Sequence, residues 1–464
     1  MRKRPGWVLA VASVASLMVA LDALVVTTAL PTIRVHLGAS IEELEWTVNA
    51  YTLSFAVLLM TGAALGERLG RRRMFAAGLA IFSGASAACA LAPNVGMLIA
   101  ARAIQGAGAA LVMPLGMTLL SAAYSPEKRA RALGIFSGIT GLAVLGGPVI
   151  GGAITQGIAW QWIFWINVPI GLVTIPVVLR RVDESHGPRS APDIAGLALV
   201  TGAALGIVWG LVRGNSAGWG GVEVIASLAV GALLAYGFVL WERRTAEPML
   251  PMGLFASRPF SSGNAAIFFL STALYGAVFF MAQFLQTVQH NGPLDAGLRL
   301  LPWTATLFIV APITGARISR VGERPFAVVG LLLQAAGMGW IALTASPDVA
   351  YLRLVAPLMM AGFGVSMAMP ALQNTVVNAV PPASIGKASG TFNMLRQLGG
   401  VFGIALLVAV FTGAGSYGSA QAFSDGFTSA IGVAAGLSLL GAVASVGLPQ
   451  RRVATVPAVS EVAA

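Results

Sequence analysis

The sequence predicts an all-α integral membrane protein with fourteen transmembrane helices, arranged as two six-helix bundles with two additional helices between them. Three observations support this prediction. Of the 464 residues, 57% are hydrophobic and only 10% are charged, whereas soluble proteins carry about 25% charged residues. Apolar runs of membrane-spanning length recur along the whole chain. A pattern in the fourth of these runs returns 256 residues later, which indicates an internal duplication.

The apolar runs define fourteen spans, each near or above the roughly 20 residues needed to cross the hydrocarbon. The start of the chain, MRKRPGW and an apolar run, is similar to a signal peptide. The run is longer than the usual apolar core of about 7–15 residues, so we interpret it as a retained first helix. The predicted spans are 7–30, 46–65, 74–92, 96–122, 132–156, 160–179, 193–213, 219–241, 260–285, 297–318, 326–345, 353–379, 389–412 and 427–448.

Lysine and arginine in the loops predict the orientation, because cytoplasmic loops carry an excess of them. With the N-terminus in the cytoplasm, 22 of the 28 basic residues fall in cytoplasmic segments and four in outer loops. Miscounting one helix would move every later loop to the other side and destroy this asymmetry. We therefore expect a multi-pass protein of the inner (cytoplasmic) membrane with both termini in the cytoplasm.

The repeat sets the expected domains. The stretch QGAGAALVMP, from Gln105, matches AGFGVSMAMP, from Ala361, with Gly106, Gly108 and Pro114 on Gly362, Gly364 and Pro370. We expect one six-helix bundle in residues 1–180, two extra helices in 193–241, a second bundle in 260–448 and a cytoplasmic tail in 449–464. Duplicated halves are typical of secondary transporters, which bind substrate between the halves near the midplane.

In the first span, Asp22 is the only carboxylate that falls well inside a predicted span of the N-terminal half. A buried carboxylate is costly and is usually functional. In the fourth span, Arg102 is a possible partner, and Gln105 lies on the same helical face at i+3. Burial favours the neutral acid and a guanidinium favours the carboxylate, so Asp22 is a candidate for proton binding. Two alternatives are open: a permanent structural ion pair, or an Arg102 that extends to the outer interface.

The loop between the second and third spans reads GERLGRRR, residues 66–73. Its arginines can be a topological anchor only. Alternatively, Glu67 and Gly70 form a polar latch with the arginines that holds the two halves together on the cytoplasmic side. The candidate gating residues are Glu67, Arg68, Gly70, Arg71 and Arg72.

The fifth span contains GLAVLGGPVIGGAI, residues 141–154. Gly147 and Gly151 have the small-xxx-small spacing that permits close helix packing, and Pro148 should bend the helix. Ordinary glycine packing is the alternative. The candidate residues of this motif are Gly141, Gly147, Pro148, Gly151 and Gly152.

Several classes of function are disfavoured. The net charge of +11 is spread over short loop clusters, so we expect no nucleic-acid partner. The sequence contains no G-x-x-x-x-G-K-[S/T] phosphate-binding loop, and the longest loops are too short for a catalytic domain, so we expect neither an enzyme nor a cofactor. The three histidines lie in loops, which predicts no buried metal site.

Polar residues inside spans are candidates for the lining of a substrate cavity: Asn49, Gln105, Gln283, Asn374, Asn393 and Arg396.

Taken together, these motifs resemble the fourteen-helix branch of the drug–proton antiporters of the major facilitator superfamily. The resemblance covers nearly the whole chain and rests on LDALVVTTALPTI, GERLGRRR, RAIQGAGAA, GGPVIGG, WQWIFWINVPIG, AGLRLLP and NMLRQLGG, in this order. It implies the major facilitator fold and exchange of hydrophobic or amphipathic compounds for protons by alternating access. It assigns proton handling to Asp22 and Arg102, gating to the loop 66–73, and antiport to the fifth-span motif. The expected protein is a monomer in the lipid bilayer.

The sequence departs from the family pattern in places. Glu67 replaces the usual Asp, Ala63 stands where Gly is common, and Asn49 stands where relatives often have an acid. The last six spans contain no acid. These departures imply fewer titratable sites and less preference for dications. Two alternatives to a drug antiporter remain: a dedicated exporter of an endogenous secondary metabolite or lipid, and a non-transporting membrane sensor or scaffold.

Overall fold

The structure is a computed structural model that describes residues 5–187, 192–381 and 384–449. The expected cytoplasmic tail therefore lies almost wholly outside the described residues. Within the described ranges the chain forms helices and no strands. Fourteen of the helical segments there are long and apolar enough to cross a membrane, which confirms the predicted all-α class and the number of spans.

The helices fall into three sets along the chain. We call α1 to α7 the N-terminal group and α10 to α17 the C-terminal group; α8 and α9 are the central pair. The N-terminal group contains α1 (Pro5–Leu37), α2 (Ile41–Leu69), α3 (Arg71–Ala90), α4 (Val95–Ala123), α5 (Pro126–Gly157), α6 (Trp162–Trp165) and α7 (Asn167–Arg181). The central pair is α8 (Ile194–Ala217) and α9 (Val222–Arg244). The C-terminal group contains η1 (Met252–Ala256), α10 (Arg258–Gln283), η2 (Phe284–Val288), α11 (Pro293–Arg299), α12 (Leu301–Thr304), α13 (Thr306–Val321), α14 (Glu323–Thr344), α15 (Tyr351–Asn378), α16 (Ile385–Ala414) and α17 (Ala420–Ser445).

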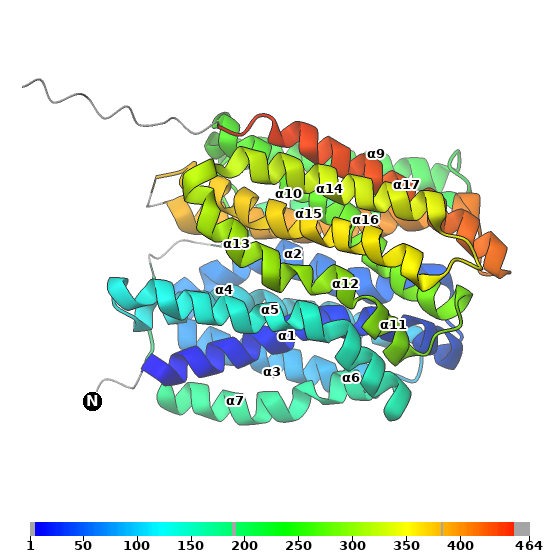
Figure 1. Cartoon of the computed structure of the whole chain (residues 1–464). Coiled ribbons are helices and arrows are strands. Elements are labelled where there is room, and N and C mark those ends of the chain that lie inside the picture. Colours follow the sequence, from blue (N-terminus) through cyan, green and yellow to red (C-terminus); the bar gives the residue numbers. More distant parts are fainter. Residues whose placement is uncertain (1–4, 188–191, 382–383, 450–464) are drawn as a thin grey trace, which may run out of the picture.

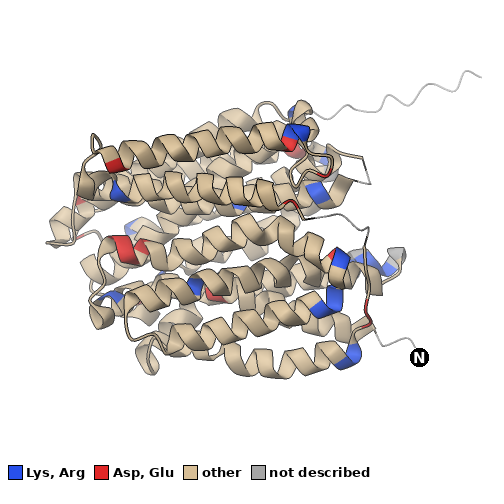
Figure 2. Ribbon diagram, turned by 180° about the vertical axis from the view of Figure 1, so that it is seen from behind, with Lys and Arg blue, Asp and Glu red and all other residues tan. Residues whose placement is uncertain are grey.

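The two groups lie side by side with their helices roughly aligned, the N-terminal group below and the C-terminal group above in Figure 1. We call the end at which α1 begins and α2 meets α3 the basic end, because lysine and arginine gather there in Figure 2. The other end, which holds the turn between α1 and α2, is the far end. Charged residues are sparse along the middle of the helices (Figure 2), as a surrounding hydrocarbon layer requires.

The internal repeat of the sequence is also a repeat of packing. Gly106 of α4 lies against the backbone of Tyr51 in α2, and Gly362 of α15 lies against the backbone of Trp303 in α12. A side chain at either glycine would overlap these atoms, so the small residue is what permits the close approach. The second glycine of each pattern repeats the relation on the next helix, Gly108 against Gly78 and Gly364 against Gly330.

The central pair covers the line along which α2 meets α16. Helix α8 packs against α9, α2 and α16. At the far end Arg213 of α8 forms an ion pair with Glu42 of α2 at 3.6 Å. Close by, Asn215 of α8 donates hydrogen bonds to the carbonyl of Ala409 and to Thr412 Oγ1 of α16. Helix α8 therefore contacts both groups.

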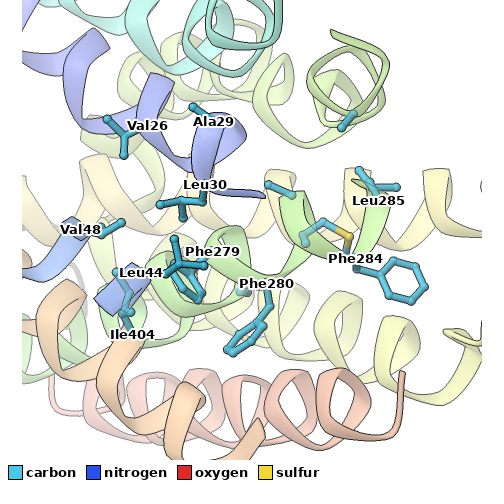
Figure 3. Close-up of a cluster of buried hydrophobic side chains, with 14 of the residues drawn as sticks. Val26, Ala29, Leu30, Leu44, Val48, Phe279, Phe280, Phe284, Leu285 and Ile404 are labelled. Carbon is cyan, nitrogen blue, oxygen red and sulfur yellow. The ribbon is translucent and has the colours of Figure 1, made fainter. Parts of the chain in front are cut away.

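At the far end, the two groups share one apolar core. Figure 3 shows Leu30 of α1 and Leu44 of α2 facing Phe279 of α10, with Ile404 of α16 beside them. Gln286 of η2 also donates a hydrogen bond of 2.9 Å to the carbonyl of Thr28 in α1. The far end is therefore closed by direct packing between the groups.

Candidate functional site

The site begins with an ion pair in the middle of the N-terminal group. Asp22 of α1 and Arg102 of α4 are 2% and 1% exposed. Arg102 Nη1 donates to Asp22 Oδ2 in a short charge-assisted hydrogen bond. The two residues that the sequence identified as candidates for proton coupling are therefore in direct contact.

Two amides complete the surroundings of the Asp22 carboxylate. Gln105 Nε2 donates to Asp22 Oδ1 at 2.8 Å, and Asn167 Nδ2 of α7 donates to the same oxygen at 3.1 Å. Both amides also donate to Ser86 Oγ of α3, at 2.7 and 3.4 Å. Three N–H donors thus bind the two carboxylate oxygens, which is the arrangement that makes a buried carboxylate tolerable.

The Arg102 guanidinium is held in place on its other sides. Its Nη1 also donates to Gln105 Oε1 at 2.7 Å, and its Nε donates to the carbonyl of Thr47 in α2 at 3.2 Å. Its Cζ lies 4.2 Å from the centre of the Tyr51 ring, a cation–π contact. The side chain is therefore directed into the bundle. This geometry contradicts the alternative in which Arg102 extends to the outer interface.

A small pocket reaches this site from the side. It has a volume of about 40 Å³ and lies between α1, α5, α6 and α7. Apolar side chains such as Leu21, Ile154 and Ile163 line most of it, and Asp22 and Asn167 supply its polar atoms. A space of this size holds roughly one or two water molecules. Asp22 thus has room beside it for a proton carrier.

The C-terminal group does not reproduce this polar site. By the 256-residue shift, Leu358 and Ala361 occupy the places of Arg102 and Gln105, and both are fully buried. The internal symmetry of the packing therefore does not extend to the ion pair, which belongs to the N-terminal group alone among the described residues.

The loop between α2 and α3 is bound by a segment that the sequence analysis did not single out. Glu184, just after α7, accepts hydrogen bonds from the backbone N–H groups of Arg72 and Arg73 at 2.9 and 3.3 Å. It also lies 3.7 Å from Arg72 Nε. Gly70 has a φ of 109°, which favours glycine. Its backbone packs against the Glu184 carboxyl group.

The expected gating residues therefore meet inside the N-terminal group. Glu67 pairs with Arg71 at 3.7 Å, within the loop itself. Its carbonyl accepts a hydrogen bond from Gly187 N–H at 3.1 Å. Arg68 is exposed. In this conformation these contacts do not form a latch between the two groups. Pairing of the loop with the C-terminal group stays a prediction.

The glycine motif of α5 lies where α1, α5 and α11 meet at the far end. Gly147 packs on Leu24, and Gly151 packs on the backbone of Val25, both in α1. On the other side, Gly152 touches the carbonyl of Pro293 in α11, and the carbonyl of Pro148 touches Gly297 of the same helix. Gly141 lies farther along α5, where a Cβ would approach the Phe308 ring only at 4.0 Å. The motif thus joins the two groups at their closed end.

The six candidates for a substrate cavity do not converge on one place. Gln105 belongs to the Asp22 site. Gln283 is buried at the far end and accepts a hydrogen bond from the Tyr417 hydroxyl. The other four share no partner with these two or with one another: Asn49 donates to Glu45, Asn374 to Glu323 and Asn393 to the carbonyl of Ser389, and Arg396 Nε is buried without a hydrogen-bond partner in the described structure.

A second buried carboxylate corrects the expectation that Asp22 is the only one in the N-terminal half. Glu45 is fully buried in α2. The predicted second span began at Trp46, but α2 begins at Ile41 because Ser40 and Glu43 form a capping box. The helix is therefore five residues longer at this end than predicted, and it carries Glu45 inside the bundle.

Comparison with known proteins identifies the family. The family model described as "Major Facilitator Superfamily" matches residues 12–404. The chain is 35% identical over 411 residues to the tetracenomycin C resistance and export protein of Streptomyces glaucescens, covering 88% of this chain and 76% of that protein. It is 33% identical over 395 residues to the multidrug resistance protein Stp of Mycobacterium tuberculosis, covering 85% and 73%.

A further relative supports the same family, and a solved structure supports the same fold. The chain is 32% identical over 455 residues to the puromycin resistance protein of Streptomyces alboniger, covering 95% of this chain and 90% of that protein. The crystal structure of the peptide transporter POT in complex with sulfate superposes with a TM-score of 0.68 at 15% identity, covering 94% and 93% of the two chains. At this identity the likeness concerns the fold. On the strength of the family model and these relatives, the chain belongs to the major facilitator superfamily.

Proposed function

We propose that the protein is a proton-coupled antiporter that exports hydrophobic or amphipathic drugs or antibiotics across the cytoplasmic membrane by alternating access. The observation that carries the proposal is the buried pair of Asp22 and Arg102, an ionisable site deep inside a membrane bundle. The relatives named for resistance and export support the direction of transport. In this proposal the basic end lies in the cytoplasm, and the protein works as a monomer without catalysis or a cofactor.

The chemistry of the site suggests how a proton drives the cycle. Protonation of Asp22 neutralises the partner of Arg102 and leaves a buried guanidinium without its anion, which favours a rearranged bundle. Each proton moving inward supplies roughly 2.3 kcal/mol per 100 mV and about 1.4 kcal/mol per pH unit. The pocket beside Asp22 is the proposed route by which a water molecule delivers or removes the proton.

The chain is proposed to consist of two six-helix bundles, residues 1–180 and 260–448, and two extra helices in residues 193–241. The substrate path is proposed to lie between the two bundles, which rock against each other during the cycle. In the present conformation the contact of α5 with α11 closes the far end, which is the outer end in this proposal. In the opposite, outward-open conformation the loop 66–73 closes the cytoplasmic end. Arg396 and Asn393 of α16 are proposed as lining residues. An Arg396 Nε without a partner among the described residues is available to a polar group of the substrate.

The test is Asp22→Asn, which keeps the shape of the side chain but cannot exchange a proton. In everted vesicles with an imposed pH gradient, the variant should lose proton-driven accumulation of ethidium while reaching wild-type levels in the membrane. Asp348→Asn, in an exposed loop, is the matched control and should behave as the wild type. Export by Asp22→Asn with an unchanged pH dependence would show that Asp22 is structural.

A dedicated exporter of one endogenous metabolite is the second candidate. Several relatives are named for single antibiotics, such as tetracenomycin C and puromycin. A resistance screen in a strain without its own pumps separates the two candidates. Protection against several unrelated compounds favours the drug antiporter, and protection against a single structural class favours the dedicated exporter.

A further inference from the structure

Glu45 is a buried carboxyl group that the mechanism above does not use. It lies in the far-end part of α2 and is fully buried. Its Oε1 accepts a hydrogen bond of 3.2 Å from Nδ2 of Asn49, one helical turn further along α2. Its Oε2 and the Oδ1 of the same Asn49 are both buried, and neither has a hydrogen-bond partner in the described part of the chain.

None of the positive charges near α2 that the structure describes forms a salt bridge with Glu45. Arg102 binds Asp22, and Arg213 binds Glu42 and Glu223. Helix α2 packs against α1, α3, α4, α8 and α16. The charged or titratable groups on those helices are Asp22, Arg34, His36, Arg71, Arg72, Arg73, Cys89, Arg102, Arg213, Lys387 and Arg396. The charged residues closest to Glu45 along α2 itself, Glu42 and Glu43, are both acids.

One proton resolves both unsatisfied atoms. An ionised carboxylate buried without a cation is strongly disfavoured. A proton on Oε2 turns this oxygen into a donor, and Asn49 Oδ1 is the free acceptor on the amide that already donates to Oε1. We propose that Glu45 and Asn49 form a second proton-binding site, a carboxylic acid paired with an amide, which takes a proton from the outside when the far end closes. This inference rests on the proposed antiport function for its orientation.

The link to closure follows from the neighbours of Glu45 in α2. Leu44 and Val48 belong to the apolar core that joins the two groups, facing Phe279 and Ile404 in Figure 3. Helix α8 covers the same part of α2. Opening of the far end takes this core apart and admits water to Glu45, which then ionises. Protonation and closure therefore favour each other, by reciprocal linkage.

The experiment measures closure of the far end directly and needs no substrate. Spin labels at Val35→Cys and Leu352→Cys, both highly exposed and one in each group, report the far-end distance in a Cys89→Ala background. The protein is full length, in lipid nanodiscs, over a series of pH values. Asp22→Asn is included to remove the other titrating site. With Glu45 intact, the ratio of closed to open molecules should rise by up to about tenfold for each pH unit of acidification.

Glu45→Gln is the decisive variant, because glutamine resembles the protonated acid and cannot titrate. It should be closed at every pH and show no pH response. Glu43→Gln is the matched control on the same helix; glutamine preserves the capping box, so the pH response should persist. If Glu45→Gln fails to fold, infrared spectroscopy of the Asp22→Asn, Glu242→Gln protein, which lacks the other buried carboxyl groups of the described chain, should still show a protonated carboxyl band in the closed state.

Three results would overturn the inference: a full pH response in Glu45→Gln, no response in Asp22→Asn with Glu45 present, or no protonated carboxyl band. If Glu45→Gln keeps the pH response and loses export of ethidium but not of neutral compounds, Glu45 binds cationic substrates instead. Absence of pH-driven export by the wild type would refute the antiport function, while the distance measurement would still report on Glu45.

Discussion

Replacing Gly152 of α5 by alanine should open the far end. An added Cβ would lie 2.6 Å from the carbonyl carbon of Pro293 and 2.8 Å from Cα of Leu294 in α11, whereas ordinary contacts begin at 3.4 Å. The carbonyl oxygen of Pro293 lies closer still, and none of these backbone atoms can rotate away, so the two helices must separate by at least about 0.8 Å, the difference between 3.4 and 2.6 Å. Overpacking of this kind typically costs about 1–3 kcal/mol.

Because Gly152 contacts the other group, this cost falls on the closed conformation and not on the fold of either group. The ratio of closed to open molecules should therefore drop by about 5- to 150-fold. The far-end spin labels would report a larger open population, and proton-driven export would slow because the cycle stalls with this end open. Labelling of a single cysteine at the far end gives an independent measure of the same change.

Two other glycines of α5 serve as controls. Gly138→Ala should be neutral, since a Cβ there has no other atom within 4 Å. Gly151→Ala should lower the thermal stability but leave closure unchanged, because its Cβ would meet Val25 and Thr28 of α1, in the same group. A Gly152→Ala protein with the wild-type distance distribution and flux would refute the assignment of this contact to closure.

Two further predictions concern hydrogen bonds. Asn167→Leu removes a donor of 3.1 Å to the Asp22 carboxylate; losing about 1–3 kcal/mol of charged hydrogen bonding should slow proton-driven accumulation of ethidium in everted vesicles, and wild-type accumulation would exclude Asn167 from the proton site. Tyr417→Phe removes the hydroxyl that donates to Gln283, a bond within the C-terminal group, and should lower the thermal stability by about 0.5–1.5 kcal/mol while leaving closure of the far end unchanged. Burial raises the pKa of Tyr417 despite Arg34 beside its ring, so the phenol stays neutral and this effect should be equal at every pH from acid to mildly alkaline. A pH-dependent loss of thermal stability, or a change of the spin-label distances in Tyr417→Phe, would contradict this prediction.

The fold was predictable because its signals are local and repeated. Each span needs a long apolar run, and the recurring glycines of the fourth and twelfth spans predicted a duplicated packing that Gly106 and Gly362 display. The contact of Asp22 with Arg102 was also predictable, since two opposite charges in a membrane interior have few other ways to be stabilised.

Other parts of the site depend on long-range contacts that leave no local signal. Asn167 is an ordinary polar residue at the start of α7 until the bundle places it beside Asp22. Glu184 lies in a linker, and its role depends on the folded position of the loop between α2 and α3. Glu45 is different, because a capping box at Ser40 and Glu43 was present in the sequence and would have placed it inside the helix.

The confinement of the ion pair to one group has an evolutionary consequence. Every side chain that binds the Asp22 carboxylate comes from α4 or α7, and the shifted positions Leu358 and Ala361 in the other group are plain apolar packing. Mutations in the C-terminal group can therefore reshape what is carried without disturbing the proposed proton site. We expect paralogues of this chain to diversify faster in α10–α17 than around the ion pair, and chimeras that exchange the C-terminal group to inherit the cargo of the donor with the proton dependence of the recipient.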